Sequence, residues 1–267
     1  MEREIVVVAC DCLTPLGRDV ASTWTQLTAN ASGIRAITRY DPAAEALHGV
    51  SSIAYAGEVP STYCEMAGSP NRYKKSPEPI FHCIGELCVG TLSSINFDIK
   101  DHDPQRIALI GATALTSQVS HHELSKDKKP FVNFLLNQCQ NVPLAIAGQE
   151  TGIRGPCFSV NSACASSGQA IYLACQLINA RVVDSALVVG HEFPIAPACA
   201  AGFEWLNALY KRDRPNDRAY TCPQAASRPL SADRHGFVLA EGIGTMLITS
   251  ADRAKAMAWP RRATPQS

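Results

Sequence analysis

Cys164 stands in a run of small residues where a strand is expected to turn into a helix. Residues 158–168 read FSVNSACASSG, an apolar strand-like segment followed by small side chains that leave room for a substrate. The positive end of a helix dipole favours the thiolate form of a thiol, which is the nucleophilic form. The pattern predicts a nucleophile held on a strand-to-helix turn. Taken alone, it fits a buried structural cysteine in a packing turn at least as well.

The segments around this turn alternate between strand-like and helix-like patterns, which is typical of a layered α/β fold with parallel strands. Strands are predicted over residues 5–10, 106–111, 156–160 and 184–190. Helices are predicted over residues 19–27, 78–94, 131–148, 166–180 and 200–210. An irregular loop is predicted over 38–76, and a hairpin over 235–249.

Composition excludes several classes of protein. The 24 basic and 24 acidic residues balance, so no overall basic field points to nucleic acid or an anionic membrane. No apolar stretch approaches the roughly 20 residues of a membrane-spanning helix, and the first apolar run is too short for a signal peptide, so we expect a cytoplasmic protein. The 11 cysteines are scattered and odd in number, which argues against a disulfide framework. We expect no metal ion and no cofactor.

Four ordered motifs resemble those of the β-ketoacyl-acyl carrier protein synthases, a family of condensing enzymes. They are GIRGP at 152–156, NSACASS at 161–167, VVGHE at 188–192 and RPLSADRHGFVLAEG at 228–242. The second of these is similar to the family's active-site motif. The resemblance therefore implies that Cys164 is the residue that takes up the acyl group.

The resemblance also implies a fold and a domain organisation. It covers the first half of a duplicated, thiolase-like fold, a layered α/β structure with a mostly parallel mixed sheet. Residues 1–250 would form the N-terminal domain of such a synthase, and residues 251–267 an atypical tail, as a truncation or frameshift would leave. Phe131 and Phe134 fall in the region that lines the family's acyl pocket, although ordinary core packing explains them as well.

Three positions depart from the family's pattern, and one group of motifs is missing. His191 replaces a small residue, His235 an aspartate and Ala240 a glycine, which suggests a divergent branch. The family's two catalytic histidines, its lysine and its glycine-rich loop lie in the second half, and their motifs do not follow Cys164 here. Because these groups stabilise the enolate of the condensation step, the chain is expected to load an acyl group but to condense poorly.

The resemblance predicts acyl transfer to Cys164, followed by decarboxylative Claisen condensation with a malonyl-carrier protein in fatty acid or polyketide biosynthesis. Its partners would be an acyl carrier protein and a second chain, either identical or a related synthase, paired through the strand before the nucleophile. One alternative is a non-catalytic protein that binds a carrier protein or partners a full synthase. Another is an unrelated cysteine hydrolase that uses Cys164 with His191 or His235.

Overall fold

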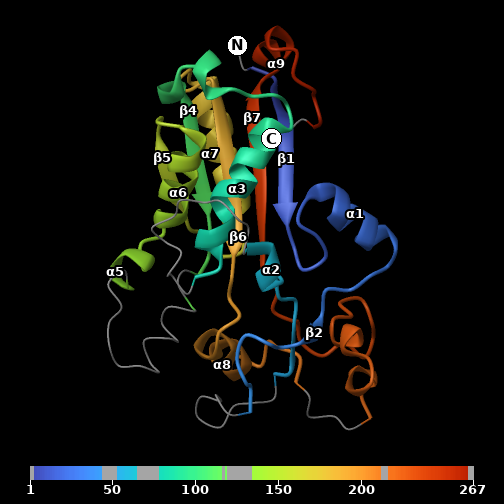
Figure 1. The fold of residues 1–267 in the computed structure, drawn as a ribbon. Coiled ribbons are helices and arrows are strands. Elements are labelled where there is room, and N and C mark those ends of the chain that lie inside the picture. The colour runs from blue at the N-terminus through green and yellow to red at the C-terminus, as the bar shows by residue number, and fades with distance from the viewer. Residues whose placement is uncertain are drawn as a thin grey trace.

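A five-stranded sheet organises the computed structural model, which describes residues 3–43, 53–64, 78–115, 118, 134–211 and 216–263. The strand order is β1-β7-β6-β4-β5 (Figure 1). The strands are β1 (Ile5–Leu13), β4 (Ile107–Ala112), β5 (Cys157–Val160), β6 (Ser185–Glu192) and β7 (Gly242–Ser250). Strand β4 runs parallel to β5 and β6, whereas β7 runs antiparallel to both β6 and β1. Four strands therefore point one way, which confirms the predicted mostly parallel mixed sheet.

Helices cover both faces of the sheet. Helices α3 (Ile80–Ser93) and α6 (Val142–Thr151) pack on one face, and α7 (Ser166–Asn179) packs on the other (Figure 1). Because successive strand residues point to opposite faces, Val6 of β1 joins the α3 and α6 side while Val7 joins the α7 side. Each buried strand thus reads as a continuous apolar run, and this is why the sequence revealed it.

Shorter elements surround this sheet. The remaining helices are α1 (Val20–Thr28), α2 (Ser61–Cys64), α5 (Phe134–Asn137), α8 (Pro197–Trp205) and α9 (Ala251–Ala256). Two short strands, β2 (Arg35–Ala36) and β3 (Tyr55–Ala56), pair with each other away from the main sheet. Single 3-10 turns lie at Ile99–Asp101, Pro104–Arg106, Arg218–Tyr220 and Pro223–Ala226. Within the described ranges, no helix is long and apolar enough to cross a membrane.

Strand β1 lies at one edge of the sheet and pairs with β7 along its whole length. Ile5 lies opposite Ser250, and Leu13 lies opposite Ile243. On the other side of β1, the backbone N–H of Val7 donates to the carbonyl of Ala263 at 2.7 Å. Part of the segment expected to be an atypical tail is therefore hydrogen-bonded to the first strand.

Several predicted elements differ from the structure in their bounds or in their type of secondary structure. The helix predicted over 131–148 is interrupted, because α5 ends at Asn137 and a new helix, α6, begins at Val142 with Pro143 in its first turn. The helix predicted over 200–210 runs from Pro197 to Trp205 instead. The loop predicted over 38–76 contains β3 and α2 in its described part.

The hairpin predicted over 235–249 is also wrong, since only its second strand exists. Residues 235–241 form isolated bridges, Phe237 with Leu209 and Ala240 with Gly57, and β7 enters the sheet between β1 and β6. Gly242 and Gly244, two glycines within the predicted hairpin, lie inside β7. Local patterning cannot show that a strand takes both of its partners from distant parts of the chain.

The approach to β5 leaves no room for a side chain at Gly155. A Cβ there would collide with the carbonyl oxygen of Ile107 and would lie 2.7 Å from that of Gln105. We expect Gly155→Ala to lower the free energy of unfolding by up to about 3 kcal/mol, because both obstacles are backbone atoms that cannot rotate away. Urea denaturation measures the change. Gly168→Ala is the matched control: its Cβ meets nothing within 4 Å, and alanine in helix α7 should add up to about 1 kcal/mol. Equal shifts for both variants would contradict this account.

Candidate active site

The predicted strand-to-helix turn is present, and Cys164 lies on it. Strand β5 ends at Val160 and helix α7 begins at Ser166. Between them Ala163 has a φ of 51°, in the left-handed region that non-glycine residues seldom adopt. Such backbone strain is a feature of turns that present a nucleophile. Cys164 follows directly and its side chain is exposed, so the alternative of a buried structural cysteine is wrong.

Two side chains hold this turn in shape. The buried Ser166 hydroxyl donates to the carbonyl of Ala163 at 2.6 Å and accepts from the N–H of Ser162 at 2.9 Å. Asn161 accepts from the N–H of Ala163 at 3.2 Å and donates to the carbonyl of Ala114 at 3.1 Å. The polar side chains on either side of Cys164 therefore fix the strained backbone of the turn.

Cys164 opens into a cavity of about 480 Å³ formed where several segments meet. They are the residues after β4, the turn before α7, the end of β6, one face of α8 and the approach to β7. The lining residues are Ala112, Thr113, Ala114, Leu115, Ala163, Cys164, Ser166, Ser167, Gly190, His191, Glu192, Pro194, Phe203, Phe237, Val238, Leu239, Ala240 and Gly242. Its size and largely apolar lining suit a small organic group bound next to the thiol.

Glu192 fixes one wall of this cavity. Its carboxylate accepts from the N–H groups of Ala114 at 2.8 Å and Leu115 at 3.1 Å. Burial raises the pKa of Glu192, and these backbone hydrogen bonds oppose the shift. The carboxylate therefore ties the segment after β4 to the end of β6. Sequence reasoning missed this role, although an acidic residue closing an apolar strand was its visible signal.

His191 lines the same cavity, next to Glu192 in β6. It is 9% exposed, and within the described ranges its Nε2 has no hydrogen-bond partner. Burial lowers the pKa of the imidazole to about 4, so the ring is neutral near pH 7. A neutral imidazole in the cavity that contains Cys164 neither repels a cationic substrate nor attracts an anionic one.

The pKa of His191 makes stability depend on pH. The folded value of about 4 lies below the unfolded value near 6.5, so the unfolded chain binds the extra proton first. Stability from this group is present above about pH 6.5 and is lost as the pH falls towards about 4, by about 3 kcal/mol at most. Urea denaturation at several pH values should show that His191→Gln removes this slope relative to the wild type. If the free energies of unfolding of the wild type and His191→Gln change in parallel with pH, the pKa of His191 does not cause this pH dependence.

Of the other residues singled out in the sequence, Ala240 also lines the cavity, whereas His235 does not. His235 packs edge-on against Tyr210, with ring centroids 6.3 Å apart. Phe131 lies outside the described residues. Phe134 is the first residue of α5, and its side chain lies outside the described part of the structure. The cavity lining thus brings together Cys164, His191 and Ala240 from that set.

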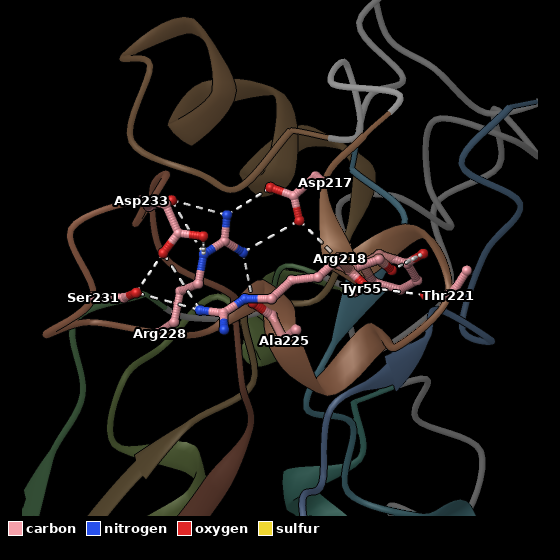
Figure 2. Close-up of polar contacts among 9 residues, drawn as sticks. Tyr55, Asp217, Arg218, Thr221, Ala225, Arg228, Ser231 and Asp233 are labelled. Carbon is pink, nitrogen blue, oxygen red and sulfur yellow. Dashed lines mark hydrogen bonds and ion pairs between the residues drawn. The ribbon is translucent and has the colours of Figure 1, made fainter.

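A buried ion pair supports the segment that leads into the cavity wall (Figure 2). The Arg228 guanidinium binds Asp217 through both nitrogens, at 2.5 and 3.3 Å, and donates to the carbonyls of Ala225 at 2.6 Å and Asp233 at 2.9 Å. The side chains of Arg228 and Asp217 are only 7% and 4% exposed. Burial raises the pKa of Asp217, but the hydrogen bond from the N–H of Ala219 and the pairing with Arg228 together hold it below its usual range. Sequence reasoning noted Arg228 only as part of a motif and gave it no role.

No metal site accompanies this cavity. Over the ranges that the structure describes, no group of three or more His, Cys, Asp or Glu side chains is placed to hold a metal ion. Among the described residues that line the cavity, Cys164 supplies a thiol and lies beside the start of α7.

Fold and site define an α/β protein that carries an exposed cysteine on a strained strand-to-helix turn. The chain matches the family "Beta-ketoacyl synthase, N-terminal domain" over residues 2–254. It belongs to that family. Two curated relatives are 3-oxoacyl-[acyl-carrier-protein] synthase 2 of Vibrio cholerae, 29% identical over 263 residues, and that of Staphylococcus aureus strain N315, 26% identical over 264 residues. The matches cover 96% and 95% of this chain but only 60% and 59% of the relatives.

Solved structures show the same fold. A beta-ketoacyl synthase from Burkholderia phymatum superposes with a TM-score of 0.76 at 20% identity, covering 97% of this chain and 62% of the other. A type II PKS ketosynthase in complex with its acyl-carrier protein gives 0.74 at 20% identity, covering 98% and 61%. The predicted first half of a ketosynthase fold is thereby confirmed.

Proposed function

We propose that this chain carries the acyl-accepting site of a β-ketoacyl-acyl carrier protein synthase. The observation that supports the proposal most directly is the exposed Cys164 on a strained turn at the head of α7, inside a cavity of about 480 Å³. In the loading step the thiolate attacks the carbonyl carbon of a carrier-protein thioester. A new S–C bond forms, the old one breaks, and the carrier thiolate leaves and takes up the proton that Cys164 gave up.

The second step in such enzymes is condensation with a malonyl thioester. Carbon dioxide leaves, and the resulting carbanion attacks the acyl group on the cysteine. The family resemblance places the histidines that stabilise the enolate in the second half of the fold, and this chain spans about 60% of its relatives. The complete reaction, in fatty acid or polyketide biosynthesis, is proposed for an assembly that includes those groups.

The proposed partners are an acyl carrier protein and a second synthase chain. Strand β5 is the edge strand of the described part of the sheet, and three of its four residues, Cys157, Phe158 and Ser159, are exposed there. An exposed strand edge offers unpaired backbone groups to another chain. Light scattering at increasing concentration tests this pairing, and a strictly monomeric protein would contradict it.

The test of the proposed function is the intact mass of the protein after incubation with an acyl-carrier-protein thioester. We expect a mass gain equal to one acyl group. A folded protein that gains no mass would refute acyl loading by this chain and would favour the alternative, a non-catalytic partner of a full synthase.

A further inference from the structure

Two cavities meet at His191. The outer cavity, of about 480 Å³, contains Cys164. A second, inner cavity of about 20 Å³ lies behind it and has room for about one water molecule. Its lining is mostly apolar, with Ile80, Phe81, Pro143 and Phe193, and also includes the polar Glu78 and Asn137. His191 and Leu115 line both cavities, so these two side chains form the partition between them.

The two halves of the partition are held differently. The backbone of Leu115 is fixed, because its N–H donates to Glu192 at 3.1 Å. The backbone of His191 is fixed in β6, opposite Ile243 of β7. Its ring, in contrast, has no hydrogen bond from Nε2 within the described ranges, so packing alone holds that edge of the imidazole. Of the two side chains that separate the space next to the thiol from the space behind it, that of His191 therefore lies on a rigid strand and has one ring edge held by packing alone.

We propose that His191 sets the depth of the cavity next to Cys164 and restricts the acyl group on that cysteine to short chains. The inference rests on the proposed function, since it names the substrate class of the same site. A linear chain growing from Sγ past the imidazole has to displace the ring or turn back towards water. Each methylene that remains in water, instead of being buried, leaves the binding affinity about fourfold lower.

Removing the ring should join the two cavities. His191→Ala deletes the imidazole and opens the inner space lined by Ile80 and Phe193 to a chain attached at Cys164. The space that an acyl chain gains equals the volume of the imidazole ring plus the volume of the inner cavity. Long chains then gain a buried apolar path that they lack in the wild type, whereas short chains gain little.

The experiment uses two series of linear reagents on the whole chain. Acyl thioesters of N-acetylcysteamine, from acetyl to decanoyl, report acyl loading. Alkyl methanethiosulfonates, from methyl to decyl, report access alone, because the Cys164 sulfur forms a disulfide with the alkylthio group and methanesulfinate leaves. Peptide mass spectrometry resolves Cys164 from the exposed Cys222, which serves as the internal reference for intrinsic reactivity.

The wild type should modify Cys164 about tenfold more slowly with long reagents than with short ones, relative to Cys222. His191→Ala should abolish that difference, and His191→Phe, which keeps a ring, should restore it. Phe203→Ala widens the outer cavity without touching the partition, so it should change all chain lengths alike. If His191→Ala does not fold, as judged by circular dichroism, His191→Ser takes its place.

The two reagent series separate the two claims. The same chain-length profile for wild type and His191→Ala with the methanethiosulfonates would overturn the role of His191. A chain-length effect with those reagents, but no acylation by any thioester, would leave His191 as the depth-setting residue and refute the proposed function of this chain.

Discussion

Replacing Cys164 by alanine is expected to abolish acyl loading, with a fall in rate on the order of 10⁴-fold or more. The thiolate is the group that forms the new bond, and alanine offers no nucleophile in its place. Intact mass after incubation with the acyl-carrier-protein thioester measures the loss. Because the Cys164 side chain is exposed on the turn, the substitution should leave the free energy of unfolding nearly unchanged.

Two further variants assign the loss to the nucleophile. Cys164→Ser keeps the shape of the side chain but replaces the thiol by a hydroxyl that ionises far less readily, so it too should load slowly. Cys157→Ala removes another exposed thiol, on β5, and should load like the wild type. Loading that survives in Cys164→Ala and disappears in Cys157→Ala would mean that the acyl acceptor has been misassigned.

Arg228→Ala is expected to lower the free energy of unfolding by about 3–5 kcal/mol. The substitution leaves Asp217, 4% exposed, as a buried charge without its bidentate partner, and it removes the donors to the carbonyls of Ala225 and Asp233. Urea denaturation measures the change. Acyl loading should fall with it, because the loop that Arg228 anchors continues into the cavity wall at Phe237.

Arg218 provides the matched control a few residues away. It forms an ion pair with Asp233 at 3.4 Å, but its side chain is 55% exposed, so Arg218→Ala should cost less than about 1 kcal/mol. Arg228→Lys should fall between the two, since an ammonium group cannot bind a carboxylate through two parallel hydrogen bonds. If Arg218→Ala and Arg228→Ala lower the free energy of unfolding equally, burial does not determine how much each ion pair contributes to stability.

The sequence revealed those parts of the fold whose signal is local. The strands over 106–111 and 184–190 are continuous apolar runs, and both lie where they were predicted, as β4 and β6. The start of α7 was equally visible, because a run of small residues follows directly on a strand. Cys164 could be located for the same reason: strand, turn and helix occupy one short stretch of chain.

What the sequence did not reveal depends on contacts between distant segments. The role of Glu192 becomes visible only when its carboxylate reaches Ala114 and Leu115 from another strand. The Arg228 pair depends on the loop that brings Asp217 beside it. The predicted hairpin failed for the same reason, because β7 pairs with β1 and β6 rather than with the residues just before it.

Strand β1 leaves the ribosome long before its partner β7 and can pair with it only after β7 has been made. Ile5 of β1 finds its neighbour in Ser250 of β7, almost the whole described chain later. At about 5–20 residues per second, roughly 10–50 s of synthesis separate the two. Such a high contact order predicts slow folding after synthesis, with the apolar β1 exposed to chaperones or to aggregation in the meantime. We therefore expect the yield of folded protein in the cell to depend on how well β1 is protected before β7 is made.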